Sequence, residues 1–191
     1  MSHPLITVCM PSIPPRTSLR NTALSSVNQQ TLQPAAISVA IDVNRKGAPA
    51  TRQRALDAVI TPWVAFLDDD DAFKPIHLEH LFEHAMETGA DMVYSWFEVL
   101  GGTDPFPATH FTNEFDPENP IETTITTLVR TNLAKEIGFQ ALDRGHDTNT
   151  GEDYRMVLEA VRQGAVIKHL VERTWYWRHH SANTSGLPTK W

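Results

Sequence analysis

Four consecutive carboxylates are the feature of this sequence that most clearly could do chemistry. Asp68, Asp69, Asp70 and Asp71 directly follow the apolar run 63–67, which is typical of a buried strand. Acids gathered at a strand end repel one another and lose solvation, so a bound cation is their natural partner. Their hard oxygen ligands favour Mg²⁺ or Mn²⁺ over zinc. The run therefore predicts a divalent-metal site, with a solvated acidic turn as the alternative.

The order of predicted elements indicates how these acids are positioned. Strand-like runs alternate with helical runs through the first hundred residues: strands at 5–10, 37–41, 63–67 and 91–99, and helices after residue 15, at 50–59 and at 76–88. This alternation predicts an α/β fold with a doubly wound, mostly parallel sheet. Ligands bind at the carboxyl ends of such strands, where Pro11, Ser12, Asp42 and the four aspartates all lie.

The second half of the chain is less regular. The segment 101–120 contains two glycines and four prolines and is predicted to be a long loop. After it we expect a smaller mixed part with a strand at 123–130, helices at 132–137 and 154–162, and strands at 165–170 and 174–177.

Composition limits the possible functions. With 191 residues, the chain suits one domain spanning 1–191. A net charge of −7 without a basic run argues against a broad nucleic-acid surface. No run reaches the roughly 18 apolar residues of a membrane span, and no signal peptide is recognisable at the N-terminus. Because the single Cys9 cannot form an internal disulfide, we expect a cytoplasmic protein.

Five patterns, in order along the chain and including the acidic run, carry a family resemblance. They are the strand ending at Pro11-Ser12 with the later run 26–31, the helix start 51–56, the run 66–71, Gly151-Glu152-Asp153-Tyr154, and the segment 176–185. Together they resemble the family 2 glycosyltransferases of the GT-A fold over nearly the whole chain. Two positions depart from the family pattern: Asp42 stands alone after its strand, and Gln53 replaces an asparagine.

The resemblance implies a nucleotide-diphosphate-sugar donor of UDP, dTDP or GDP type and a Mn²⁺ or Mg²⁺ cofactor. Asp70 would contact the metal directly, Asp68 would contact the donor ribose or the metal through water, and Asp71 would support them. His180 would reach the metal or the diphosphate, although a histidine in a polar tail is more often a surface residue.

The expected donor-binding set is Pro11, Ser12, Asp42, Arg52, Asp68 and Asp69. Asp42 can accept an N–H from a base edge, and Arg52 can pair with phosphate through two hydrogen bonds. The ordinary alternatives are a strand-end acid and a solvated helix arginine.

For catalysis, the resemblance implies an inverting transfer in which Asp153 removes the proton of the acceptor hydroxyl. Glu152 would orient Asp153 or share its hydrogen bonds. An acid pair favoured by a helix N-terminus is the alternative for these two residues. Residues about 5–100 would bind the nucleotide-sugar, and about 101–185 would supply the base and bind an unknown hydroxyl acceptor.

Two other functions remain open at this point. A non-catalytic module could bind a nucleotide-sugar or a divalent metal through the same residues. A nucleotidylyltransferase would be expected to carry a glycine-rich basic loop after the first strand, where this chain has the proline-rich run 11–16.

Overall fold

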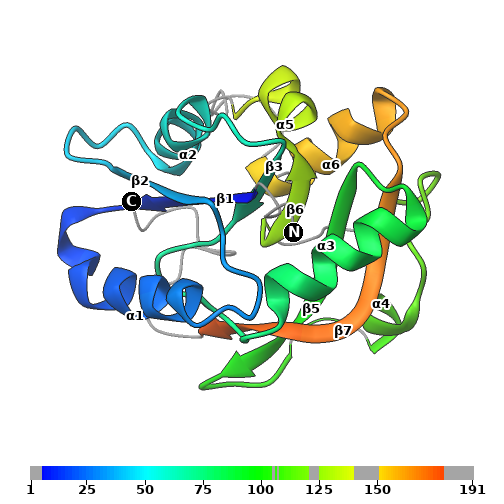
Figure 1. Cartoon of the computed structure of the whole chain (residues 1–191), viewed down its shortest axis with the longest axis horizontal. Helices are drawn as coiled ribbons and strands as arrows, with labels where there is room; N and C mark the ends of the chain where they lie inside the picture. Colours follow the sequence, from blue (N-terminus) through cyan, green and yellow to red (C-terminus); the bar gives the residue numbers. More distant parts are fainter. Residues whose placement is uncertain (1–5, 105, 107, 121–124, 140–150, 179–191) are drawn as a thin grey trace.

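A seven-stranded sheet runs through the centre of the molecule (Figure 1). The computed structural model describes residues 6–104, 106, 108–120, 125–139 and 151–178. The strand order is β2-β1-β3-β6-β5-β7-β4. The strands are β1 (Ile6–Ser12), β2 (Ala36–Ile41), β3 (Trp63–Phe66), β4 (Ala72–Phe73), β5 (Met92–Leu100), β6 (Thr127–Arg130) and β7 (Ile167–Arg178).

The sheet is parallel where the first three strands meet and mixed elsewhere. β1 pairs in parallel with β2 and β3. β6 runs antiparallel between β3 and β5, β7 is parallel to β5, and β4 is antiparallel to β7. Among the described residues between β5 and β6, the only helix is the short α4 (Ala108–Thr112), which suits antiparallel neighbours because they need no crossover helix. The predicted α/β fold is confirmed, with parallel pairs both among the N-terminal strands and between β5 and β7.

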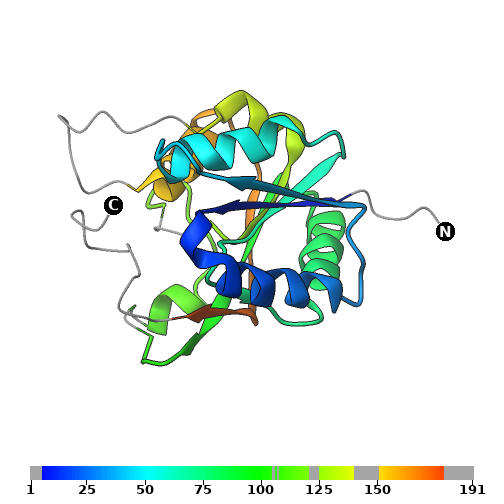
Figure 2. The same ribbon diagram turned by 90° about the vertical axis from the view of Figure 1, so that its left-hand side faces the viewer.

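Helices cover both faces of the sheet (Figure 2). One face carries α1 (Thr17–Asn28) and α3 (His77–Thr88). The other carries α2 (Ala48–Asp57), α5 (Thr131–Ile137) and α6 (Glu152–Arg162). Because successive strand residues point to opposite faces, Val8 and Met10 of β1 pack under α1 and α3, while Cys9 packs under α2.

The local sequence explains why α3 forms and where it ends. In α3, Leu78, Leu81 and Ala85 recur at helical spacing and are fully buried. The helix ends at Gly89, whose φ of 68° is a left-handed conformation that favours glycine. This is the helix predicted at 76–88.

The C-terminal half differs in detail from the prediction. The two strands expected at 165–170 and 174–177 are one continuous strand, β7, whose pairing with β5 is shifted at Trp96. The loop expected at 101–120 contains α4, and the two-residue strand β4 was not predicted. Among the described residues, no helix has the length and apolar character needed to cross a bilayer.

Candidate active site

Side chains from three parallel strands meet at one edge of the sheet. Ser12 ends β1, Asp42 follows β2, and Asp68 lies two residues after β3. Ser12 Oγ donates a 2.7 Å hydrogen bond to Asp69 Oδ2, so the end of β1 is joined directly to the acidic run. The structure thus brings these predicted residues to the same edge, and Pro11 lies buried in β1 beside them.

The four aspartates do not point the same way. The backbone N–H of Asp71 donates to the Asp68 carbonyl at 3.2 Å, which turns the chain back on itself. As a result, Asp68, Asp70 and Asp71 each offer a carboxylate oxygen within 4.8 Å of the others. Asp69 instead faces Ser12. Asp71, expected to support the site from behind, therefore lies among the possible metal ligands.

This acidic triad (Asp68, Asp70 and Asp71) has the chemistry and size to hold a divalent cation. Two oxygens on opposite sides of one ion are separated by about 4.2 Å, because each Mg²⁺–oxygen distance is about 2.1 Å. Burial raises the pKa of Asp71 well above its usual range, and the charges of Asp70 and Asp68 raise it further. A cation would relieve that repulsion, so the residues fit the predicted Mn²⁺ or Mg²⁺.

Arg16 supplies a positive charge to the same cluster. It ends η1 (Pro14–Arg16), the short 3₁₀ turn that follows β1. Its Nη1 donates to Asp69 Oδ1 and to Asp70 Oδ2, each at 2.9 Å. The sequence patterns did not predict a role for this residue. The available signal was a cation directly after the first strand, at the edge where the aspartates also had to lie.

Arg52 joins the acidic run to the start of α6. Its guanidinium, with the side chain only 4% exposed, donates to Asp68 Oδ1 at 2.6 Å and pairs with Glu152 Oε1. Asp153 Oδ1 lies 3.9 Å from the same group. Burial works to lower the pKa of Arg52, but the nearby charges of Asp68 and Asp153 outweigh it and raise the pKa overall. Arg52 therefore stays charged and holds both acidic segments.

The acids of α6 differ in exposure. Glu152 and Asp153 occupy the first turn of the helix, where the macrodipole favours negative charge. The Glu152 side chain is 14% exposed and that of Asp153 is 34% exposed. Glu152 is thus turned toward Arg52, whereas Asp153 is the more open to solvent.

Asp42 shapes the loop that leads into α2. Its two carboxylate oxygens accept the backbone N–H groups of Lys46 at 2.9 Å and Gly47 at 2.8 Å. Gly47 has a φ of 90°, a conformation that favours glycine, and directly precedes the helix that carries Arg52. Burial works to raise the pKa of Asp42, but these hydrogen bonds lower it overall. Asp42 is therefore an ionised carboxylate at the strand edge.

The end of β7 also reaches the acidic run. The backbone N–H of Arg178 donates to Asp71 Oδ1 at 2.9 Å, and its Nε donates to the Asp70 carbonyl at 3.2 Å. Arg178 belongs to the C-terminal motif of the family resemblance. His180, the predicted metal or diphosphate contact, lies outside the described residues.

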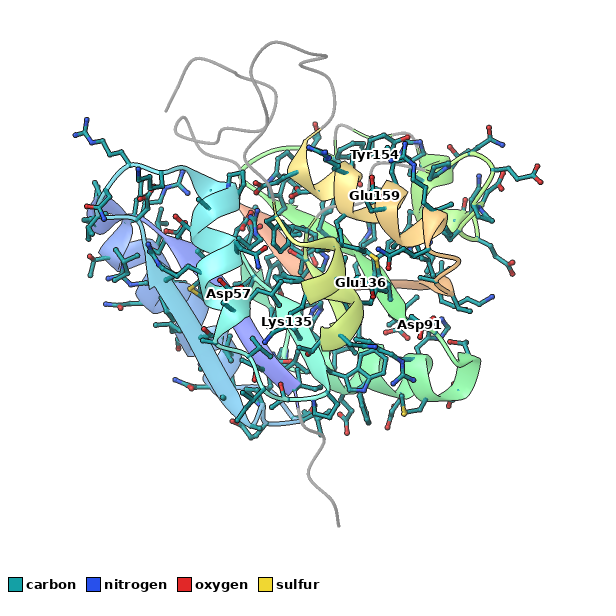
Figure 3. All side chains as sticks on the ribbon, turned by 90° about the horizontal axis from the view of Figure 1, so that it is seen from above. Asp57, Asp91, Lys135, Glu136, Tyr154 and Glu159 are labelled. Atoms are coloured by element: carbon teal, nitrogen blue, oxygen red, sulfur yellow. The ribbon has the colours of Figure 1, made fainter. Side chains whose placement is uncertain are left out.

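Gln53, which replaces the family's asparagine, supports the site from α2. Its Oε1 accepts the backbone N–H of Phe139 at 2.6 Å. Figure 3 shows α2, α5 and α6 side by side, with Asp57 on α2 near Lys135 on α5. Lys135 Nζ donates to the carbonyls of Asp57 at 3.2 Å and Val59 at 2.7 Å. Gln53 and Lys135 together fasten the end of α5 to α2.

Comparisons with solved structures identify the fold. The TarS fragment 1–349 from S. aureus, in complex with UDP-GlcNAc, superposes with a TM-score of 0.77 at 18% sequence identity, over 94% of this chain and 60% of that one. The same fragment in complex with UDP gives a TM-score of 0.73 at 18% identity, over 92% and 60%. The chain thus spans 60% of the TarS fragment. At this identity, the likeness shows the fold alone.

Sequence comparison identifies the family. No curated protein sequence matches the chain. The family model described as Glycosyl transferase family 2 matches residues 24–142, which include the acidic run, Arg52 and Asp42. Since this match covers more than half of the chain, the protein belongs to glycosyltransferase family 2.

Proposed function

We propose that this domain transfers a sugar from a nucleotide-diphosphate-sugar to a hydroxyl group of an acceptor, with inversion at the sugar and with Mn²⁺ or Mg²⁺ as cofactor. The observation that carries the proposal is the Arg52 linkage. One buried guanidinium joins Asp68 of the acidic run to Glu152, the neighbour of the proposed base Asp153. This linkage supports a single site for donor binding and proton removal.

The donor would bind at the carboxyl edge of β1, β2 and β3. Family membership and the UDP complexes of the TarS fragment favour a nucleoside diphosphate there. Asp42 is buried and ionised at this edge and would accept an N–H from the base. Ser12, Pro11 and Asp69 would lie beneath the donor, and Ser12 and Asp69 are hydrogen-bonded to each other. We propose that residues about 5–100 bind the donor and that residues about 101–185 bind the acceptor and supply the base.

The metal would be held by the acidic triad. When bound, it stabilises the negative charge that develops on the departing diphosphate. Arg52 was expected to bind phosphate, but its guanidinium lies between Asp68 and Glu152. We assign it to positioning these acids.

Asp153 would act as the general base. As the acceptor oxygen attacks the anomeric carbon, Asp153 takes the hydroxyl proton, and the bond from that carbon to the diphosphate oxygen breaks. The nucleoside diphosphate leaves with the electron pair. Glu152 supports this arrangement through its ion pair with Arg52.

Replacement of Asp70 tests the proposal. Asp70→Ala should abolish Mn²⁺-dependent UDP binding, measured by titration calorimetry, because it removes a carboxylate of the triad. Its circular dichroism spectrum should stay that of the wild type. Glu83→Gln, at an exposed acid of α3, is the matched control and should bind as the wild type does. Unchanged UDP affinity in Asp70→Ala with Mn²⁺ present would refute the metal-dependent mechanism.

A further inference from the structure

We infer that Arg16 is a positioning residue that holds the acidic run before ligands bind and moves to the donor diphosphate when the cation site fills. Arg16 would thereby make metal and nucleotide bind cooperatively. The inference rests on the proposed metal-dependent donor binding and adds a residue and an order of events to it.

The first support is the way Arg16 bridges two acids. A single nitrogen, Nη1, donates to carboxylates of both Asp69 and Asp70 at 2.9 Å. The side chains are only 14%, 4% and 11% exposed for Arg16, Asp69 and Asp70. Ion pairs this enclosed are screened little by salt. Without a metal, Arg16 therefore neutralises part of the acidic run.

The second support is that Arg16 and the metal would share a ligand. Asp70 accepts from Arg16 and also belongs to the acidic triad. Two positive charges on one carboxylate repel each other, so a cation in the triad weakens the hold of Asp70 on Arg16. Filling the triad should therefore release the guanidinium, at least from Asp70.

The third support is the position of Arg16 in the fold. Pro14 and Pro15 precede it in η1 and restrict the backbone, so movement would be confined to the long side chain. This turn lies directly after β1, at the edge where the donor diphosphate is proposed to bind. A guanidinium released there can form two parallel hydrogen bonds with phosphate oxygens.

Arg52 could not serve in the same way. Its side chain is 4% exposed, it pairs with Asp68 and Glu152, and its guanidinium lies over the Phe139 ring at 5.4 Å. Withdrawing it would leave Glu152, which is 14% exposed and lies outside the acidic triad, without a cation to compensate it, which is unfavourable. Arg16, with the more exposed side chain, is the better candidate for exchange.

The inference predicts a specific change in binding. In Arg16→Gln, Mn²⁺ alone should bind at least about 5-fold more tightly than in the wild type, because Arg16 no longer competes with the ion for Asp70. UDP should enhance Mn²⁺ binding less than in the wild type, whose coupling we expect within the usual range of about 5- to 150-fold. Activity is not needed for this readout.

Titration calorimetry on the full chain measures these Mn²⁺ affinities. Mn²⁺ is titrated with and without saturating UDP into the wild type, Arg16→Gln and a matched control, Arg162→Gln. Arg162 ends α6, its side chain is 68% exposed, and it pairs with Glu159. Because neither Arg162 nor Glu159 belongs to the acidic triad, the control should keep wild-type affinity for Mn²⁺ alone. Arg16→Lys retains the charge and should keep Mn²⁺ affinity near the wild-type value, which provides a second test if Arg16→Gln does not fold.

The outcomes separate the inference from the proposed function. If every variant binds Mn²⁺ with UDP but Arg16→Gln matches the wild type for Mn²⁺ alone, the inference is wrong and the metal-dependent mechanism stands. If Arg16→Lys gains Mn²⁺ affinity although it folds, charge compensation is also refuted. If no protein binds Mn²⁺ with or without UDP, both the inference and the metal-dependent mechanism fail.

Discussion

At the scale of single residues, the adjacent acids Glu152 and Asp153 are given different tasks by their surroundings. Glu152 pairs with the buried Arg52, which fixes its position. Asp153 is more exposed and lies farther from Arg52. A base must reach the acceptor hydroxyl and still be able to take up a proton, which favours Asp153.

Asp153→Asn should therefore separate binding from catalysis. The amide keeps the size of the side chain but cannot accept the hydroxyl proton, so turnover should fall by about 10²-fold or more. Affinity for the donor should change by no more than a few-fold. Steady-state kinetics and UDP calorimetry on the same preparation measure both.

Glu152→Gln is the comparison for that variant. Near wild-type turnover in Asp153→Asn together with a large loss in Glu152→Gln would move the base to Glu152.

Residues whose role depends on distant partners could not be predicted from the sequence. The acidic run, Arg52 and the Glu152-Asp153 pair are marked by local patterns. Arg16 is not, because its importance depends on partners more than fifty positions away. The different directions of Asp69 and Asp71 depend on a turn between Asp68 and Asp71 that four identical letters do not reveal.

At the scale of elements, a buried polar seam joins α3 to the C-terminal strands. His77, at the start of α3, is fully buried and stacks on Phe73 of β4, with the two ring centroids 4.0 Å apart. Its Nδ1 lies 2.7 Å from Thr174 Oγ1, which is 2.5 Å from Ser95 Oγ. The seam lies beside the acidic run, which β4 directly follows and which Arg178 at the end of β7 contacts.

This seam makes stability depend on pH in a defined direction. Burial lowers the pKa of His77 from 6.5 to about 3. Below pH 6.5 the unfolded chain takes up a proton on the His77 ring and the folded chain does not. The contribution of neutral His77 to the free energy of unfolding is therefore complete well above pH 6.5 and is lost as the pH falls.

His77→Gln, which can still hydrogen-bond to Thr174, removes this titration. As the pH falls from 6.5 toward 5, the difference in free energy of unfolding between the wild type and His77→Gln should change to the disadvantage of the wild type, with a slope that approaches about 1.4 kcal/mol per pH unit. Urea unfolding at several pH values measures it, and parallel pH curves for the two proteins would show that His77 does not titrate as described.

The elements that sequence patterns missed are those with little local signal. Two residues make up β4, which exists because Ala72 and Phe73 pair with β7. β7 is continuous because it pairs along the whole of β5, despite the shift at Trp96. Periodicity predicted α1, α2 and α3 more closely, since each has a regular buried face.

At the scale of the whole molecule, residues from both halves of the chain meet at the candidate site. The parallel strands β1, β2 and β3 place the acidic run and Asp42 at one edge, as the sequence predicted. The later elements then bring in Glu152, Asp153 and Arg178. Arg52 and Gln53 of α2 connect the two parts, through Glu152 and the Phe139 backbone.

The central claim is that this arrangement activates a nucleotide-sugar. The most direct measurement is release of nucleoside diphosphate from a panel of UDP-, dTDP- and GDP-sugars with Mn²⁺, since slow hydrolysis of the donor needs no knowledge of the acceptor. We expect release from at least one donor by the wild type, and its loss in Asp70→Ala and on addition of EDTA. Absence of release from every donor, together with absence of nucleotide binding in the presence of Mn²⁺, would contradict the proposed activity.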